Sequence, residues 1–220
     1  MITLVVEAST YHGSAALLNG GVLLAQRSVA MRGREHEALM PAVAELLSEA
    51  GIAPAGVGRV VCGAGPGSFT SLRIAASIAK GMALATGASL VPVSSLALLV
   101  ASVQPQKAGR YVAAVDAMRG ESYAAIFFVS GAGELAEEGA VRLVKTETLD
   151  AMASEAGAFV VGPGRHGDAQ VFPHAASAAR ITNVIDATDH ADLAAWEPGY
   201  GRLAEAQVKW ESEHGRPLQS

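Results

Sequence analysis

The chain has 220 residues, half of them hydrophobic, a formal net charge of −5 and a single cysteine, Cys62. This length allows one large domain or two small ones with a buried core, without disulfides or a structural metal. One cysteine excludes an intramolecular disulfide and favours a reducing compartment, and we expect Cys62 to be a small core residue. Basic residues are scattered among acids, which argues against a protein that grips a nucleic-acid backbone by itself.

The sequence also argues against export and against a membrane span. The first residues, Met1–Glu7, have no basic region and reach a carboxylate too early for a secretory signal. No apolar run approaches membrane-spanning length. We therefore expect a cytoplasmic protein.

Three apolar runs at the start of the chain predict strands over Ile2–Val6, Ser14–Leu18 and Val22–Val29. The Asn-Gly-Gly sequence at 19–21 is typical of a hairpin turn between the last two. From about Glu37 to Ala50, apolar residues recur at helical spacing and predict an amphipathic helix. Its apolar stripe comprises Leu39, Val43, Leu46, Leu47 and Ala50.

A glycine-dense loop, Gly63–Gly67, joins a predicted strand at Val57–Cys62 to a predicted helix at Ser71–Thr86. Ser68 or Thr70 could cap the helix start. Exposed amides at such a loop favour an anion, but the Gly-Lys-Ser/Thr ending of a phosphate loop is absent. A tight turn for strand–helix packing is therefore favoured, and a phosphate cradle is the alternative.

The following elements suggest two α/β units. A strand at Leu90–Val93 and an apolar helix at Ser94–Ser102 complete a βββαβαβα order, and a turn-rich break follows at Gln104–Gly109. The second region repeats the pattern of apolar runs and helices more weakly. Its predicted elements are strands at Tyr111–Val115, Tyr123–Val129 and Phe159–Val161, and helices at Thr146–Glu155 and Thr188–Trp196.

Two groups of polar residues could carry chemistry. Glu7, at the end of the first strand, lies where many α/β proteins bind phosphate and magnesium, although a polar strand end is the simpler interpretation. Asp116, Arg119 and Glu121 form a mixed-charge turn, for which mutual pairing at a domain cleft is favoured over catalysis.

Several familiar motifs begin but are not completed. The sequence from His36 to Met40 starts like the zinc motif H-E-x-x-H and ends in methionine. His166 and His174 have no Cys or carboxylate at ligand spacing, and no G-x-S-x-G elbow of a serine hydrolase occurs. We predict no catalytic residues, no metal and no cofactor.

Three motifs together carry a resemblance to a known family. They are Gly65-Pro66-Gly67-Ser68-Phe69-Thr70 with Leu72-Arg73-Ile74 and Lys80-Gly81, Asp116-Ala117 with Arg119-Gly120-Glu121 and Tyr123, and Glu197-Pro198 with Tyr200 and Arg202. With them the chain resembles the bacterial TsaB (YeaZ) family, dimerisation subunits of the machinery that makes threonylcarbamoyladenosine (t6A) in tRNA.

The resemblance implies an α/β fold of the actin-like ATPase (ASKHA) type, with two RNase H-like subdomains of which the second is smaller. Residues 1–104 would form the first and carry the partner-binding helices. Residues 105–220 would form the second, and its terminal helix could pack back on the first.

The resemblance also implies a role. In that family the protein pairs with its larger homologue TsaD, and with the ATPase TsaE the assembly transfers threonylcarbamoyl to N6 of adenosine 37 in tRNAs that read ANN codons. TsaD holds its catalytic metal with histidines of an N-H-x-x-x-H motif, where this chain has Ser95 and Leu99. Neither side chain supplies an imidazole, so the implied role is a non-catalytic scaffold that contacts tRNA only through the complex.

Two departures from the family pattern bear on nucleotide binding and packing. Glu7 stands where an aspartate is usual, and Ser71 replaces the glycine of the GPGSFTGLR motif. We expect little ATP hydrolysis. An actin-like ATPase or small-molecule kinase is the alternative function, and a metallopeptidase, a label attached to relatives, would require a bound metal.

The scaffold role predicts an interface made by two helices, 37–50 and 71–86, which would meet the equivalent pair on TsaD. Periodicity alone leaves open which face of each helix turns outward. In the absence of TsaD the same apolar surface predicts a homodimer. The predicted partner-binding residues are Leu39, Met40, Val43, Leu47, Arg73, Ala76, Ser77 and Lys80.

Overall fold

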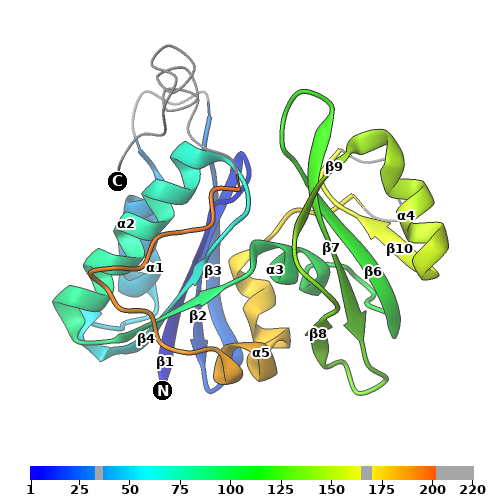
Figure 1. Cartoon of the computed structure of the whole chain (residues 1–220). Coiled ribbons are helices and arrows are strands. Elements are labelled where there is room, and N and C mark those ends of the chain that lie inside the picture. Colours follow the sequence, from blue (N-terminus) through cyan, green and yellow to red (C-terminus); the bar gives the residue numbers. More distant parts are fainter. Residues whose placement is uncertain (33–36, 165–169, 202–220) are drawn as a thin grey trace, which may run out of the picture.

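The structure, a computed structural model, describes residues 1–32, 37–164 and 170–201 (Figure 1). Two five-stranded sheets stand beside each other, with strand orders β3-β2-β1-β4-β5 and β10-β6-β7-β8, and β9 pairs with β7 in the second. This arrangement confirms the predicted α/β class and the two-part architecture. Within these ranges no helix has both the length and the hydropathy to cross a bilayer.

The first sheet is built almost as the sequence predicts. Its central strand β1 pairs antiparallel with β2, placing Leu4 opposite Leu17, and parallel with β4, placing Val5 opposite Val61. The strands are β1 (Ile2–Glu7), β2 (His12–Asn19), β3 (Val22–Ala30), β4 (Val57–Gly63) and β5 (Ser89–Val93).

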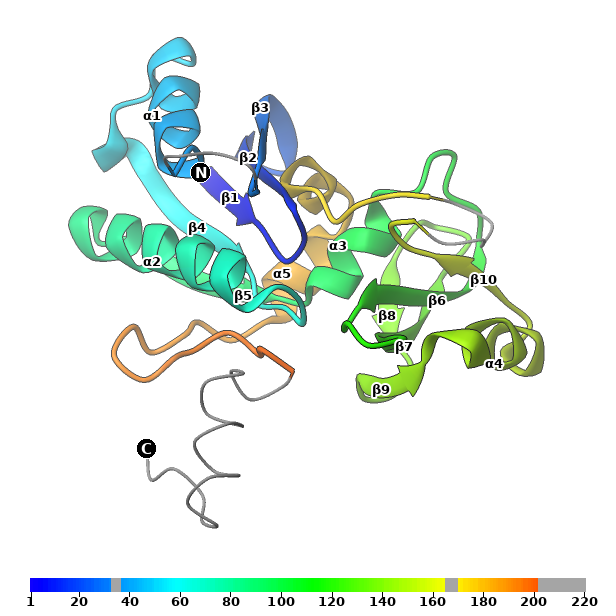
Figure 2. The ribbon, with the colours of Figure 1, turned by 90° about the horizontal axis from the view of Figure 1, so that it is seen from above.

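Both faces of the first sheet are buried along its central strands, which explains the apolar runs Leu4–Val6 in β1 and Val60–Cys62 in β4. Leu4 and Val6 face α1 (Leu39–Glu49) and α2 (Phe69–Thr86), whereas Val5, between them, faces a different core cluster on the other side. Figure 2 shows α1 and α2 on the outer face and α3 on the face turned toward the second sheet. A short 3₁₀ helix, η1 (Pro54–Gly56), leads into β4.

Helix α3 (Ser95–Ala101) lies between the two sheets, and all seven of its residues are buried. Ser94 caps it by accepting a hydrogen bond from the Ala97 N–H at 3.4 Å. A helix that is apolar on every side is stable only when it is enclosed. Because its core cluster contains residues of both sheets, α3 joins the two subdomains.

The second sheet is smaller and is covered on its outer face by one helix, α4 (Leu149–Ala156). The sequence analysis missed two of its strands, because β8 and β9 are short and carry exposed, partly charged side chains. Its strands are β6 (Gly109–Asp116), β7 (Glu121–Val129), β8 (Leu135–Glu137), β9 (Arg142–Lys145) and β10 (Ala158–Val161), and η2 (Thr146–Thr148) precedes α4.

The chain then returns to the first sheet. Two short helices, η3 (Ala175–Arg180) and α5 (Thr182–Ala187), contribute Ala175, Ala178, Ile181 and Ile185 to the core between the sheets. At the start of η3, the His174 side chain accepts a hydrogen bond from the Ala176 N–H at 3.1 Å and lies 2.9 Å from the Ser28 hydroxyl. His174 is therefore a capping residue of η3.

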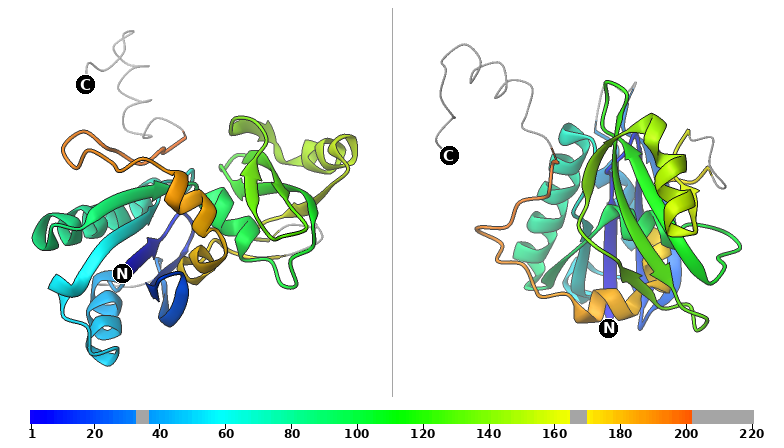
Figure 3. Two further views of the ribbon diagram at one scale, coloured as in Figure 1. Left: turned by 90° about the horizontal axis from the view of Figure 1, so that it is seen from below. Right: turned by 45° about the vertical axis from the view of Figure 1, so that its right-hand side comes forward.

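The predicted helix over Thr188–Trp196 is wrong. The helix ends at Ala187, and residues 188–201, which we call the strap, run without a helix alongside α2 (Figure 3). The Asp192 side chain accepts a hydrogen bond from the Ala194 N–H at 2.9 Å, and this local turn competes with helical pairing. The strap is held to the sheet edge by the Ala191 N–H, which donates to the Leu90 carbonyl at 2.8 Å.

The enclosure of α3 predicts a large loss of stability on truncation of its core side chains. Leu99 is fully buried, so Leu99→Ala should lower the free energy of unfolding by about 3 kcal/mol through lost contacts and a residual cavity. Leu84 on α2 is 77% exposed, so Leu84→Ala should cost less than about 0.5 kcal/mol. Urea unfolding of both variants measures the difference, and equal losses would show that α3 is not enclosed.

Candidate functional site: a closed glycine loop and a helical docking face

Glu7, the strongest candidate for chemistry in the sequence, is fully buried at the end of β1. One carboxylate oxygen accepts a hydrogen bond from the Ser9 N–H, and the other accepts from the Ser95 hydroxyl at 2.8 Å. Burial raises the pKa of the Glu7 carboxyl, while the hydrogen bonds from Ser9 and Ser95 act in the opposite direction. The carboxyl is thus enclosed by protein and does not present its oxygens to a cleft.

Ser95 connects this carboxyl to the glycine loop. Its hydroxyl accepts a hydrogen bond from the Gly65 N–H at 3.1 Å, and its own N–H donates to the Gly65 carbonyl at 3.0 Å. Gly63 is required for the contact, because a Cβ atom there would lie 1.7 Å from a Glu7 carboxylate oxygen. Glu7, the loop and the start of α3 therefore form one buried hydrogen-bonded unit.

The loop uses its remaining described hydrogen bonds to close on its neighbours. The Ala64 N–H donates to the Val93 carbonyl at 2.8 Å, and the Ser68 N–H donates to the Ser9 carbonyl at 2.7 Å. A Cβ atom at Gly67 would lie 2.0 Å from that same carbonyl oxygen. With the amides of residues 64, 65 and 68 bonded to protein acceptors, the loop does not fit a phosphate, and the packing-turn interpretation is the one the geometry supports.

The predicted cap of α2 differs in detail. Ser68 occupies the N-cap position but caps no backbone amide, and its hydroxyl instead lies 3.1 Å from the Ser71 hydroxyl. Thr70 lies inside the helix, which begins at Phe69. Ser71 is buried, so the residue that replaces the family's usual glycine is accommodated by this pairing of hydroxyls.

The residues present do not fit a catalytic metal of the kind the family resemblance implies for TsaD. Ser95 is committed to Glu7 and Gly65, and Leu99 lies in the core. Over the described ranges no three His, Cys, Asp or Glu side chains converge. His36 and His166 lie outside those ranges.

Cys62 is fully buried, as the sequence predicts. Burial and the neighbouring Glu7 carboxyl raise the pKa of its thiol, so it stays protonated. In the turn from Asp116 to Glu121, Asp116 accepts a hydrogen bond from the Met118 N–H at 2.9 Å. Met118 and Arg119 adopt positive φ angles of 65° and 58°, and the predicted charge pairing within this turn stays a prediction.

The eight predicted partner-binding residues fall into two groups. Leu39, Val43 and Leu47 are buried against the first sheet, and Ala76 is only 6% exposed. The three side chains of α1 offer a partner almost no surface, because the apolar stripe of α1 is the face that packs on its own sheet. Ala76 of α2 contributes only a small surface, at the edge of a hollow. The accessible group consists of Met40, Arg73, Ser77 and Lys80.

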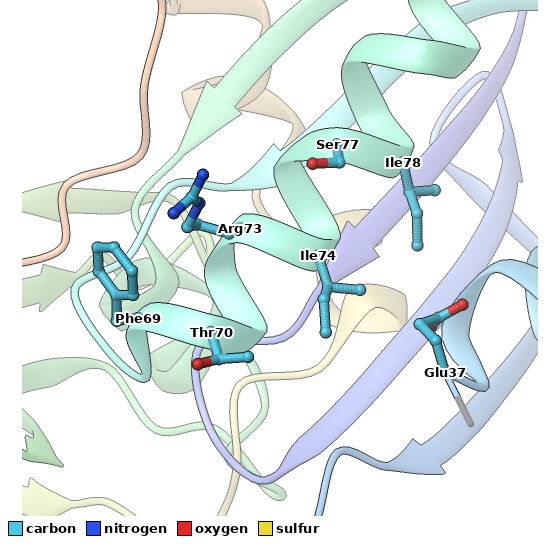
Figure 4. Close-up of a pocket in the computed structure, with 7 residues that line it drawn as sticks. All are labelled: Glu37, Phe69, Thr70, Arg73, Ile74, Ser77 and Ile78. Atoms are coloured by element: carbon cyan, nitrogen blue, oxygen red, sulfur yellow. The ribbon is translucent and has the colours of Figure 1, made fainter. Parts of the chain in front are cut away.

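The accessible residues of α2, Arg73, Ser77 and Lys80, border two hollows on either side of this helix. A groove of about 450 Å³ lies toward the start of α1, where Ile74 and Ile78 point in the direction of Glu37 (Figure 4). A smaller hollow of about 90 Å³ lies toward the strap. Arg73 and Ser77 line both, and so they form the ridge of α2 between them.

Sequence reasoning missed three residues of this surface. Ile74 and Ile78 line the groove and are half-buried. Glu37 caps α1 by accepting hydrogen bonds from the Leu39 and Met40 amides. The isoleucines repeat at a spacing of four residues beside the small core residues of α2, which is the signal that could have identified a second apolar face.

The fold and the site define a two-subdomain actin-like protein whose glycine loop is closed and whose accessible surface features lie on α1 and α2. A family model described as TsaD, tRNA N6-adenosine threonylcarbamoyltransferase, matches residues 29–183. The chain belongs to this family, on its TsaB (YeaZ) branch.

Curated relatives and solved structures support this assignment. TsaB of Haemophilus influenzae is 34% identical over 121 residues, 54% of this chain and 51% of that protein. TsaB of Escherichia coli is 34% identical over 125 residues, 56% of this chain and 53% of that protein. These matches thus span about half the length of the curated relatives.

The structural match is more complete. YeaZ from Pseudomonas aeruginosa superposes with a TM-score of 0.76 at 28% identity, over 90% of this chain and 98% of that chain. A structure described as similar to peptidase YeaZ from the same organism gives a TM-score of 0.78 at 28% identity, over 91% and 99% of the two chains. The ASKHA fold predicted from the sequence is confirmed.

The closed loop predicts opposite effects of alanine at two glycines. Gly67→Ala places a methyl group against the Ser9 carbonyl and should lower the free energy of unfolding by about 2 kcal/mol. At Gly81, on the exposed side of α2, no atom lies within 4 Å of the added Cβ, so Gly81→Ala should stabilise by up to about 1 kcal/mol. Thermal and urea unfolding compare the two, and a neutral Gly67→Ala would show that the loop is open.

Glu7 predicts a pH dependence of stability. Because its folded pKa lies above the ordinary value of 4.5, the folded chain binds the proton more tightly, and stability falls as pH rises from 4.5 through the folded pKa. Glu7→Gln should remove this contribution. Burial lowers the pKa of His174, so this residue makes stability rise with pH just below 6.5, in the wild type and in Glu7→Gln alike. The quantity to measure is therefore the difference in the free energy of unfolding between the two proteins across pH 4.5–8. Parallel curves would show that Glu7 does not titrate differently on folding.

Proposed function

We propose that this chain is the non-catalytic scaffold subunit of the t6A machinery, which pairs with TsaD and works with TsaE. The assembly would transfer threonylcarbamoyl to N6 of adenosine 37 in cytoplasmic tRNAs that read ANN codons. The family model and the names of the curated TsaB relatives support the pathway. Contact with tRNA would come through the complex, consistent with the net charge of −5.

The observation that carries the scaffold role is the bonding of Ser95. At the position that corresponds to a metal ligand in TsaD, this side chain holds Glu7 and Gly65 together inside the protein. The second corresponding position is Leu99, in the core. Recovering a metal site would require both residues to change and the loop to open.

The accessible surface of α1 and α2 supports a docking role. Its members are Met40, Arg73, Ser77 and Lys80, together with the groove residues Ile74 and Ile78. Ser77 and Gly81 are small and exposed on α2, which permits close approach of a partner helix. An interface of standard size would bury about 1,600 Å² in total. Without TsaD, the same face would support a homodimer.

The alternative function, an actin-like ATPase or small-molecule kinase, makes a different prediction. It requires magnesium-dependent nucleotide binding near the glycine loop, where three amides are already bonded to protein acceptors. Calorimetric titration with Mg-ATP distinguishes the two. Micromolar affinity with measurable turnover would favour the alternative, and no heat of binding is expected for the scaffold.

The docking face predicts that bulk on the α2 ridge blocks the partner without unfolding the chain. Ser77 is exposed between the two hollows, so Ser77→Arg should abolish co-elution with TsaD on gel filtration, a loss of at least roughly 100-fold in affinity if a central contact is broken. The threonylcarbamoylation of tRNA by a reconstituted mixture of this chain, TsaD and TsaE should fall in parallel.

Ser154→Arg is the matched control, because Ser154 is an exposed serine on α4, a helix of the second subdomain. It should co-elute with TsaD like the wild type. Retention of the complex by Ser77→Arg, with an unchanged unfolding midpoint, would place the interface elsewhere. Substitutions at Val43 or Ala76 would be poor tests, because both side chains are buried and their replacement by arginine would disrupt the core.

A further inference from the structure

The strap meets α2 on the flank opposite the groove. Figures 2 and 3 show it running beside the helix, and Glu197 and Tyr200 line the smaller hollow together with Arg73 and Lys80. Both cations belong to the accessible surface that we propose for docking. The contacts of the strap therefore affect the orientation of the Arg73 and Lys80 side chains.

Tyr200 is the centre of these contacts. Its ring lies on Phe69, with ring centroids 4.6 Å apart, and its hydroxyl donates a hydrogen bond to the Glu197 carboxylate at 2.7 Å. Burial and the bond to Glu197 raise the pKa of Tyr200 to about 12, so the hydroxyl remains a donor at neutral pH. One side chain thus fixes a ring of α2 and a carboxylate of the strap.

Each of those two groups in turn contacts one cation. The Arg73 guanidinium lies 5.4 Å from the centroid of the Phe69 ring, a cation–π contact. The Lys80 ammonium lies 3.9 Å from the other Glu197 oxygen and 5.8 Å from the centroid of the Trp196 ring. Both cations are therefore reached from Tyr200 through a single intermediate residue.

The backbone of the strap is anchored at the same place. The Gly199 N–H donates to the Ala64 carbonyl at 2.8 Å, and a Cβ atom at Gly65 would lie 2.4 Å from the Gly199 carbonyl oxygen. Pro198 restricts the backbone between Glu197 and this anchor. The closed glycine loop thereby holds the backbone next to Tyr200 in place beside the start of α2.

From these contacts we propose that Tyr200 is a positioning residue, which orders Arg73 through Phe69 and Lys80 through Glu197 on the face of α2 that meets TsaD. The inference rests on the proposed scaffold function and adds the mechanism that prepares its docking face. Isolated surface ion pairs contribute little by themselves, so the effect of Tyr200 lies in reducing the freedom of two long side chains before binding.

The two branches can be separated by substitution. Tyr200→Phe keeps the ring on Phe69 and removes the bond to Glu197, so it should release Lys80 and leave Arg73 ordered. Tyr200→Ala should release both. Side-chain NMR relaxation of Lys80 and of the Arg73 Nε–H bond measures this in the full chain without any partner.

Binding to TsaD provides the second readout. Tyr200→Phe should weaken affinity roughly fivefold, which corresponds to about 1 kcal/mol, the net contribution of one ordinary intramolecular hydrogen bond. It should have no further effect in a Lys80→Ala background and its full effect in an Arg73→Ala background. Glu197→Gln, which removes the charge that pairs with Lys80, should weaken binding to a similar extent. Glu138→Gln is its matched control, because it removes the charge from the Arg110–Glu138 pair of the second subdomain and should leave binding unchanged.

The outcomes are distinct. Loss of order at Lys80 together with weaker binding supports the proposal. Unchanged order in both Tyr200 variants overturns it, and so does loss of order with unchanged affinity. If the wild-type chain does not bind TsaD at all, the proposed function fails, and the relaxation data alone then decide whether Tyr200 positions the two cations.

Discussion

The hydrogen bond between Ser95 and Glu7 is the interaction on which the arrangement of the first subdomain depends. It joins residues 88 positions apart and brings together the end of β1, the glycine loop after β4 and the start of α3. A buried carboxyl is costly unless hydrogen-bond donors surround it, so this bond fixes the relative position of all three elements. The loop in turn sets where α2 begins and where the strap is anchored.

This network shows how a glycine-rich loop can serve close packing of protein atoms in place of phosphate binding. A phosphate site needs free amide donors and space in front of them. Here Ala64, Gly65 and Ser68 donate to protein acceptors, and the carbonyl oxygens of Ser9 and Gly199 occupy the space beside the loop. The glycines remain necessary for a steric reason, since protein atoms approach where a ligand otherwise would. A glycine-rich loop therefore indicates that other atoms come close to its backbone. The hydrogen-bond partners of the loop amides show whether those atoms belong to the protein or to a ligand.

The sequence predicted most of the first sheet because its central strands are buried on both faces and the Asn-Gly turn marks a hairpin. It failed where local and tertiary preferences disagree. The apolar spacing at 188–196 resembles a helix, but the Asp192 turn and the bond from Ala191 to β5 favour an extended strap. The proposed docking face was only half predictable. Helical periodicity identifies the apolar stripe of α1, yet that stripe faces the sheet, and only Met40 of its four predicted residues is exposed. The Ser95–Glu7 bond is invisible to local patterns because it spans 88 residues.

The composition of α2 follows from what lies on three of its sides, which are the first sheet, the groove and the strap. Ala75 and Ala79 pack toward the sheet, Ile74 and Ile78 line the groove, and Lys80 faces the strap. Small residues on the sheet side let the helix lie close to β4. The larger side chains of α2 named here lie on the sides of the groove and the strap. An exposed surface of mixed serine, arginine and isoleucine is less prone to aggregation than a continuous apolar stripe would be. In the proposed docking role such a helix would offer shape and charge to a partner, provided that its long cations are held in place. The strap supplies that restraint from the side that the groove leaves free.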